Sequence, residues 1–361
     1  MRAYERSASP AEPVLAAVIV TRNEGPWVAR SIESVLRALA PFPGAQAVLV
    51  DSRSVDGTVA VARRYPITVA VVRPGVRCTA ALGRLAGQQL TRSKYILFVD
   101  GDTEIASEWV RAAVRVMDEQ PAVAGVGGKL HEIHYRNGVP VGETADFFGM
   151  GEGAEEAYQL GGNALYRRAA LETAGSFNPH VISHEEAELA ERLRAHGYQL
   201  IRIPLTVGTH HTGERTALRE CWRRFRGGLL VGYGQVLRLS LRTPAFWRHA
   251  RALNRYLATL TFLALGVLAT ILWLLVGERG VAAAWGAVAL LAVGLWAVRA
   301  RSVARPIGVI GEWVLAAPAI VWGFWRVAAP AGAVDARALV EIVSRAEAFR
   351  GAESPGARVS C

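Results

Sequence analysis

Two carboxylates separated by a single glycine follow directly after an apolar run of the chain. The segment Tyr95–Ile105 reads YILFVDGDTEI, which places Asp100 and Asp102 on either side of Gly101. Carboxylate oxygens are preferred ligands of Mg²⁺ and Mn²⁺, and such an ion can also bridge to a diphosphate. A short acidic turn that caps the following helix would explain the same residues. The pair by itself therefore leaves both a divalent cation site and a structural turn open.

Polar residues also follow two earlier apolar runs. Thr21, Arg22, Asn23 and Glu24 come after VLAAVIV, and the segment Asp51–Asp56 comes after QAVLV. The carboxyl ends of parallel strands meet at one edge of a sheet, and ligands of open α/β folds bind there. We therefore expect the three acidic clusters to share one site.

The segments between these clusters alternate between two hydrophobic patterns. Continuous apolar runs typical of buried strands occupy residues 14–20, 46–51, 67–72 and 95–100, and helical spacing occupies residues 26–39, 56–65 and 79–90. Such alternation predicts an α/β domain with a parallel sheet that helices cover on both faces.

Four motifs occur in a characteristic order. They read VIVTRNEG, VLVDSRSVDGT, YILFVDGDTEI and HEEAELAERLRAHGYQLIRIP. Over roughly residues 14–230 the chain resembles the family 2 glycosyltransferases. The resemblance implies a GT-A fold, which is the Rossmann-like α/β fold of nucleotide-diphospho-sugar transferases.

The resemblance also implies which residues face a nucleotide sugar. The turn Thr21–Glu24 and Asp51 match positions that hold the nucleobase and the ribose. Arg77 and Arg84 fall where the family has basic residues near the nucleotide and its phosphates, although Leu85 replaces the asparagine usual after the second arginine. The residues expected to contact the nucleotide are Thr21, Asn23, Glu24, Asp51, Arg77, Arg84, Asp100 and Arg223.

Three residues are implied as metal ligands for Mg²⁺ or Mn²⁺. Asp102 resembles the second aspartate of the family's aspartate-x-aspartate motif, which holds the metal, and Asp100 resembles the first, which lies against the ribose or the metal. The segment VGTHHTGER resembles a strand end that adds a metal or diphosphate contact. We expect His211 to supply this contact and keep His210 as the alternative.

Two adjacent glutamates are candidates for the catalytic base. An inverting transfer needs a carboxylate that takes the proton from the acceptor hydroxyl. Glu186 stands where the family commonly has its base, and Glu185 before it is the alternative. An acid-rich helix N-terminus would carry the same residues for its own stability. The segment GGNALYRR resembles the strand that lines the acceptor side, with Asn163 as a substrate hydrogen-bond donor.

The segment RECWRRFRGG, residues 219–228, resembles in its position a motif of processive polysaccharide synthases. That motif reads glutamine-x-x-arginine-tryptophan, whereas Arg219 stands where the glutamine would be. We therefore predict an interfacial helix in which Trp222, Arg223 and Arg226 approach the diphosphate of a lipid carrier or of the donor. A solvated basic face is the alternative.

Membrane helices are predicted late in the chain. Leu257–Val276 has no charged residue and is long enough to cross a hydrocarbon core of about 30 Å. Val281–Val298 follows after a GERG turn, and Pro306–Trp325 is a third candidate in which Glu312 would need a partner. Residues 215–255 carry ten arginines and one acid, which is typical of a segment at an anionic cytoplasmic leaflet.

We expect a multi-pass protein of the inner (plasma) membrane with a cytoplasmic catalytic domain. The early apolar run Val14–Val20 is too short for a signal peptide. The three cysteines, Cys78, Cys221 and Cys361, have no metal-ligand spacing and suit a reducing compartment. We expect no nucleic-acid partner, because aromatic residues do not interleave with arginine as in nucleic-acid-binding modules.

The expected organisation is a disordered lead (1–13), a GT-A domain (14–234), a basic juxtamembrane connection (235–255), two or three transmembrane helices (256–328) and an amphipathic tail (329–361). The tail from Asp335 has helical spacing and predicts a surface helix. The expected function is metal-dependent, inverting transfer of a sugar from a nucleotide sugar, a UDP-sugar first, to a saccharide or polyprenyl-linked acceptor at the membrane in envelope or exopolysaccharide synthesis. A polyprenyl-phosphate glycosyltransferase, a processive synthase and a non-catalytic partner that binds nucleotide sugars remain alternatives.

Overall fold

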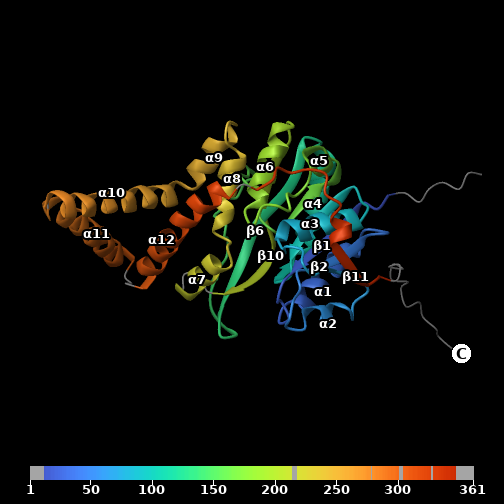
Figure 1. Ribbon diagram of the computed structural model, residues 1–361. Helices are drawn as coiled ribbons and strands as arrows, with labels where there is room; N and C mark the ends of the chain where they lie inside the picture. The colour runs from blue at the N-terminus through green and yellow to red at the C-terminus, as the bar shows by residue number, and fades with distance from the viewer. Residues whose placement is uncertain (1–11, 214–217, 278, 301–303, 327, 347–361) are drawn as a thin grey trace, which may run out of the picture.

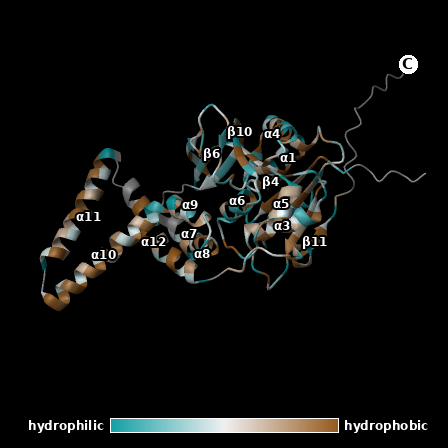
Figure 2. Ribbon diagram, turned by 90° about the horizontal axis from the view of Figure 1, so that it is seen from above, coloured by the Kyte–Doolittle hydropathy of each residue, from teal (hydrophilic) through white to brown (hydrophobic). Residues whose placement is uncertain are grey.

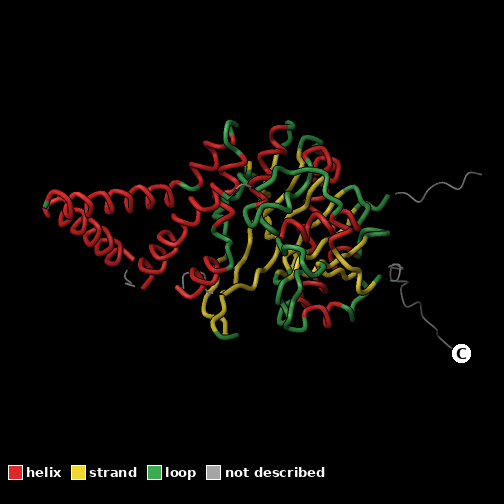
Figure 3. Tube along the Cα trace, viewed as in Figure 1, coloured by secondary structure: helices red, strands yellow, loops and turns green. Residues whose placement is uncertain are grey.

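The computed structural model describes residues 12–346 apart from residues 214–217, 278, 301–303 and 327. Figure 1 shows an α/β domain from which three long helices project on one side. The α/β domain mixes strands and helices, whereas the projecting part is entirely helical where it is described (Figure 3). The expected disordered lead lies largely outside the described residues.

One mixed sheet organises the α/β domain. Its strand order is β11-β3-β2-β1-β4-β9-β6-β10-β5, with β7 paired to β6 and β8 paired to β10. The strands are β1 (Leu15–Thr21), β2 (Gln46–Asp51), β3 (Thr68–Val72), β4 (Tyr95–Asp100), β5 (Thr103–Ile105), β6 (Val123–Arg136), β7 (Val139–Thr144), β8 (Glu155–Glu156), β9 (Ala164–Arg167), β10 (Gln199–Gly213) and β11 (Val340–Ser344). Neighbours among β3, β2, β1 and β4 are parallel, whereas β9 runs antiparallel to β4 and β6.

Helices cover both faces of this sheet, as the apolar runs predict. Successive side chains of a strand point to opposite faces, so Ile19 packs with α1 and α4 while Val18 packs with α3, α5 and α6. The helices of the domain are α1 (Val28–Leu39), α2 (Thr58–Ala62), α3 (Ala80–Leu90), α4 (Ser107–Glu119), α5 (Arg168–Ala174) and α6 (Glu185–Ala195). The predicted α/β fold with helices on both faces is thus confirmed, whereas the predicted parallel order holds for β3, β2, β1 and β4 and the sheet as a whole is mixed.

The register of the central strands brings their polar ends to one edge. Thr21 pairs with Asp51 across β1 and β2, and Val20 pairs with Asp100 across β1 and β4. A side chain at Gly101 would not fit, because a Cβ atom there would lie 2.4 Å from Cγ2 of Thr21. The glycine between the two aspartates therefore allows the ends of β1 and β4 to approach closely.

Six helices follow the last long strand. They are α7 (Leu218–Arg226), α8 (Val231–Leu239), α9 (Ala245–Ala252), α10 (Asn254–Val276), α11 (Arg279–Ala300) and α12 (Ala304–Trp325). Within α10, α11 and α12, the segments Asn254–Val276, Arg279–Arg299 and Gly308–Trp325 are long and apolar enough to cross a membrane. Figure 2 shows that α10 and α11 are mainly apolar along their length. This finding favours membrane association.

The acid in the third apolar helix has partners. Glu312 of α12 forms an ion pair with Arg224 of α7, with 3.2 Å between Oε1 and Nη1. The hydroxyl of Tyr256 donates a hydrogen bond of 3.3 Å to the same carboxylate. An acid among apolar helices is costly without such partners, so these contacts also hold α7 against α12.

The expected domain boundary at residue 234 falls inside α8, and α8 packs against α12. A Cβ atom on Gly234 would lie 2.0 Å from the carbonyl oxygen of Ile320, and one on Gly323 would lie 2.0 Å from that of Val231. Glycines at this crossing let the two backbones touch. The helices α7 to α9 thus form a layer between the α/β domain and the projecting helices (Figure 1).

The predicted surface helix from Asp335 is wrong within the described residues. A 3-10 turn (Ala336–Leu339) leads instead into β11, which pairs antiparallel with β3 at the edge of the sheet. Its helical spacing was outweighed by the unpaired backbone groups of the edge strand, which favour pairing with another strand. The end of the expected tail, residues 347–361, lies outside the described residues.

Candidate functional site

A polar cleft lies at the carboxyl ends of the central strands. Its volume is about 570 Å³. The predicted site residues that line it are Thr21, Glu24, Arg77, Asp100, Asp102 and Glu185. The tip of β1 contributes the first two of these residues, the turn after β4 contributes the two aspartates, and the start of α6 contributes Glu185. Seven segments that are distant in the sequence meet here, because the end of β2, the loop before α3, His210 of β10 and the loop after α7 also line the cleft.

Asp102 is held by a histidine that is itself held by a second acid. Oδ2 of Asp102 lies 3.1 Å from Nε2 of His210, and Nδ1 of His210 lies 3.0 Å from Oε1 of Glu132. Burial by itself lowers the pKa of His210, but the hydrogen bonds to Asp102 and Glu132 outweigh it and raise the pKa to about 10. The histidine is therefore a cation that balances the surrounding acids.

The acids of the cleft repel one another. Burial, together with the charges of Asp102 and Asp100, raises the pKa of Glu24 to about 8. Among the described residues, no group of three or more His, Cys, Asp or Glu side chains could hold a metal ion by itself. Asp102 nevertheless fits a divalent cation that shares its ligands with a substrate, because Mg²⁺ is usually bound by one or two carboxylates together with phosphates. Protonated His210 has no lone pair for a metal ion and instead places a positive charge beside this position.

A buried arginine joins the aspartate pair to the two candidate bases. Arg84 of α3 is 3% exposed and contacts Asp100 at 2.9 Å, Glu185 at 2.5 Å and Glu186 at 3.3 Å. Burial disfavours its charge, but the three carboxylates outweigh this effect and raise its pKa. Burial and the charge of the adjacent Glu186 raise the pKa of Glu185, and Arg84 lowers it in part. The resulting pKa is about 7. Arg84 therefore positions both glutamates relative to Asp100.

The two glutamates differ in their surroundings. The side chain of Glu185 is 5% exposed and lines the cleft, whereas that of Glu186 is 14% exposed and has the longer contact with Arg84. Both lie in the first turn of α6, where the helix dipole favours negative charge. His184 before them has a left-handed backbone, with φ of 64°, which turns the chain into the helix.

The predicted nucleobase and ribose residues form a hydrogen-bonded layer under the cleft. Asp51 is fully buried and accepts hydrogen bonds from the Thr21 hydroxyl at 2.9 Å and the Ser54 hydroxyl at 2.5 Å. Asn23 has a left-handed backbone, and its side-chain oxygen accepts from the backbone N–H of Val55 at 2.9 Å. Asp51 and Asn23 thus shape the rim of the cleft through their neighbours.

His211 does not reach the cleft, contrary to the expected choice between the two histidines. Its Nε2 lies 2.8 Å from Glu104 and its Nδ1 lies 3.1 Å from the Tyr135 hydroxyl. Its ring stacks on Trp27 at 4.3 Å between centroids. Adjacent residues of a strand point to opposite faces, so only one of the pair on β10 can face Asp102, and that residue is His210.

Arg223 also lies apart from the cleft. It is an exposed residue of α7 and is not among those that line the cleft, whereas Gly227 and Leu229 just after the helix are. The Ser183 hydroxyl donates a hydrogen bond to the carbonyl oxygen of Leu229, which ties this rim to the start of α6. The basic helix therefore borders the site through the loop that follows it.

One contributor, Glu132, was missed from the sequence, and another, Asn163, makes a different contact from the one expected. Glu132 belongs to no motif, and it reaches His210 only because β6 and β10 pair in a register that sets these two residues opposite each other. Asn163 was expected to bind substrate, but its side-chain oxygen accepts the backbone N–H of Asp100 at 2.9 Å. It therefore orients the turn that carries the two aspartates.

Comparisons with known proteins agree with this architecture. The sequence model of Glycosyl transferase family 2 matches residues 16–175. The chain is 25% identical over 334 residues to the succinoglycan biosynthesis protein ExoA of Rhizobium meliloti, a match that covers 86% of this chain and 93% of ExoA. It is 24% identical over 242 residues to the glycosyltransferase AglE of Haloferax volcanii, which covers 64% of this chain and 77% of AglE.

A solved structure shares the fold. The mannosyltransferase PcManGT from Pyrobaculum calidifontis, in complex with GDP-Man and Mn²⁺, superimposes with a TM-score of 0.56 at 19% sequence identity, and the match covers 88% of each chain. The mixed sheet and its likeness to this structure define an α/β protein of the GT-A fold. Residues 16–175 carry the sequence pattern of glycosyltransferase family 2, and the two relatives are similar beyond this segment.

Proposed function

We propose that the protein transfers a sugar from a nucleotide sugar, preferably a UDP-sugar, to a polyprenyl-linked saccharide presented at the membrane. The transfer would need a divalent cation and would invert the configuration of the anomeric carbon. The observation that carries the proposal is the convergence of Asp102, His210, Arg84 and Glu185 around one cleft beside the juxtamembrane helices. Synthesis of an envelope glycan or exopolysaccharide fits the similarity to ExoA. It also fits the similarity to the O-antigen chain rhamnosyltransferase WbaN of Salmonella anatum. WbaN is 23% identical over 197 residues, a match that covers 51% of this chain and 62% of WbaN.

The aspartates and His210 would hold the diphosphate end of the donor. Asp102 would supply a carboxylate ligand to the cation, protonated His210 beside it would add positive charge near the phosphates, and Asp100 lies next to them. When bound, Mg²⁺ or Mn²⁺ would neutralise the charge that develops on the departing diphosphate. Arg77 at the rim offers a further cation to the phosphates. Thr21 and Glu24 line the part of the cleft where the nucleoside would lie.

A glutamate at the start of α6 would act as the base. As the acceptor oxygen attacks the anomeric carbon, its proton passes to the carboxylate, and the bond between that carbon and the diphosphate oxygen breaks on the opposite face. We assign this role to Glu186, because the shorter contact with Arg84 holds Glu185 in a buried ion pair. Glu185 is the alternative, since its side chain lines the cleft.

The membrane setting supports a lipid-linked acceptor. The rim at Leu229 continues directly into α8, which packs against the apolar helix α12. A multi-pass protein of the inner membrane, with the cleft on the cytoplasmic side, would meet both nucleotide sugars and polyprenyl carriers there. The basic segment of residues 215–255 fits an anionic cytoplasmic leaflet.

Turnover by the purified full-length protein tests the proposal. The protein in nanodiscs would be given radiolabelled UDP-, GDP- and dTDP-sugars, Mg²⁺ or Mn²⁺, and synthetic polyprenyl-diphosphate-linked sugars. Label is expected in the lipid fraction only with a divalent cation, and a chelator is expected to abolish it. Transfer to bare polyprenyl phosphate instead would reassign the acceptor, and absence of turnover with every donor would contradict the proposal.

A further inference from the structure

A second, smaller cavity lies between the α/β domain and the projecting helices. Its volume is about 160 Å³. It is lined by Tyr158 and Gln159 before β9, His184 before α6, Tyr233 of α8, His249 of α9 and Tyr256 of α10. These segments belong to the α/β domain on one side and to the juxtamembrane layer on the other. A molecule held here would therefore lie at the membrane side of the domain.

The cavity adjoins the candidate site through two short connections. His184 directly precedes Glu185, so the residue that lines the cavity and the one that lines the cleft are neighbours in the chain. On the other side, Gln159 is followed four residues later by Asn163, which orients the backbone of Asp100. The cavity thus lies beside the candidate bases but outside the cleft that holds Asp102.

The side chains around the cavity suit a neutral, hydroxyl-rich ligand. Its walls combine aromatic rings with hydrogen-bonding groups, and the hydroxyl of Tyr158 lies 2.5 Å from Nδ1 of His249. Burial lowers the pKa of His184 to about 3 and that of His249 to about 4, so both rings are neutral near pH 7. Tyrosine presents an apolar face and a polar hydroxyl, which is useful at the boundary of water and lipid.

One residue that lines this cavity, Gln159, has a side-chain oxygen without a hydrogen-bond donor in the described part of the chain. Among the described residues, the side-chain oxygen of Gln159 is buried and accepts no hydrogen bond. A buried carbonyl oxygen without a donor is costly and uncommon in native proteins. A sugar hydroxyl can donate to it, whereas an ionised phosphate has only acceptor oxygens. The only arginine in the lining, Arg255, is exposed at the start of α10.

We propose that this cavity binds one sugar ring of the acceptor and so presents the acceptor hydroxyl to the start of α6. The proposal rests on the proposed function, since it names the saccharide part of a membrane-presented acceptor as the ligand. Tyr158, Gln159 and His249 would bond the ring hydroxyls, and the Tyr233 and Tyr256 rings would pack against its C–H face. The lipid would then extend along α10.

Ligand-observed NMR on the full-length protein in nanodiscs tests this assignment. The probes are methyl glycosides of glucose, galactose, mannose, rhamnose and N-acetylglucosamine at millimolar concentration. UDP and Mg²⁺, without Mn²⁺, are added to fill the donor cleft. We expect saturation transfer to at least one glycoside in the presence of UDP. Gln159→Leu should weaken its binding at least about fivefold, because a buried hydrogen bond is lost. The exposed Gln199→Leu is the matched control and should change nothing.

A second variant and a second probe keep the outcomes distinct. Ala252→Leu adds volume at the rim of the same cavity and should weaken the glycoside to a similar extent. UDP affinity should stay within about twofold in every variant, which shows that the fold and cleft are intact. Binding of no glycoside by the wild type, unchanged binding in both variants, or competition by inorganic phosphate would overturn the assignment. Failure of UDP itself to bind the wild type would instead contradict the proposed function.

Discussion

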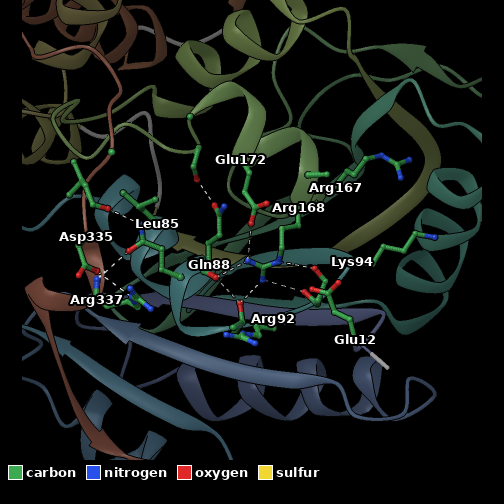
Figure 4. A pocket seen from close by; sticks show the side chains of 18 of the residues that line it. Glu12, Leu85, Gln88, Arg92, Lys94, Arg167, Arg168, Glu172, Asp335 and Arg337 are labelled. Carbon is green, nitrogen blue, oxygen red and sulfur yellow. Dashed lines mark hydrogen bonds and ion pairs between the residues drawn. The ribbon is translucent and has the colours of Figure 1, made fainter. Parts of the chain in front are cut away.

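The two large hollows of the α/β domain lie at opposite ends of the same strand, β4. The cleft at its carboxyl end has a volume of about 570 Å³, whereas a groove at its amino end has about 1310 Å³. Figure 4 shows this groove, with Arg167, Arg168, Lys94 and Arg337 among its walls. By size alone, the groove would be the stronger candidate for a binding site.

Arg167 and Arg168 of the groove are already bonded to the protein's own backbone. Arg168 donates to the carbonyl oxygens of Ser93 at 2.7 Å and Gln88 at 3.0 Å, and Arg167 donates to that of Met117 at 2.6 Å. Gln88 and Met117 lie in the last turns of α3 and α4, so the arginines satisfy helix C-termini. In the cleft, by contrast, burial and the charges of Asp102 and Asp100 raise the pKa of Glu24, and all three side chains line open space. Acids crowded at an open cleft, rather than volume, mark the end of the sheet at which we propose the reaction takes place.

Removal of the carboxylate at the centre of the cleft should have the largest effect. Asp102→Asn is expected to lower kcat by ~100-fold or more, since the carboxylate would help to neutralise the departing diphosphate. Steady-state transfer of labelled sugar at saturating cation measures this loss. Thermal unfolding should move little, because the change also relieves repulsion with Glu24. Retention of most of the activity would remove the cleft from its proposed role.

The two glutamates of α6 should separate into a catalytic and a structural partner. Glu186→Gln is expected to lower kcat by about 10²–10⁴-fold with little loss of stability, as for removal of a general base. Glu185→Gln weakens the contact with Arg84, but Arg84 keeps Asp100 and Glu186 as partners. The pKa of Glu185 is also raised to about 7, so we expect a loss of about 1–3 kcal/mol. Unfolding monitored by fluorescence, together with kcat, distinguishes them. The reverse pattern would make Glu185 the base.

A change in the groove should affect stability and leave catalysis intact. Arg168→Leu removes the donors for Ser93 and Gln88 and is expected to destabilise the fold by about 2–3 kcal/mol with kcat unchanged. The denaturation midpoint measures the loss. Arg92→Leu is the matched control, since its exposed side chain lines the same groove, and it should stay within about 0.5 kcal/mol of the wild type. A large fall in kcat for Arg168→Leu would give the groove a role in the reaction.

The smallest expected effect concerns pH and the buried histidine of α9. The pKa of His249 is lowered from 6.5 to about 4, first by burial and then by Arg248 and Arg194. Between these values the unfolded chain binds more protons than the folded one, so stability should rise with pH from about 4 to 6.5. His249→Gln should make this rise shallower in melting scans at several pH values. An unchanged slope would show that the folded state accepts the charged ring.

Some parts of the fold and site were predictable from local pattern. The strands that end at Thr21, Asp51 and Asp100 follow from continuous apolar runs, and their convergence follows from parallel order. The three apolar helices follow from length and composition. The surface helix predicted after Asp335 was wrong, because local spacing says nothing about the unpaired edge of β3 that the segment joins.

The sequence by itself therefore determined an α/β domain with acids at its strand ends and apolar helices behind it, since these depend on neighbours within a few residues. Only the tertiary structure decided that His210 and not His211 faces Asp102, that Glu132 supports it, and that Arg84 joins Asp100 to α6. The physical reason is that side-chain direction depends on strand register and on partners far away in the chain, and no local pattern records either one.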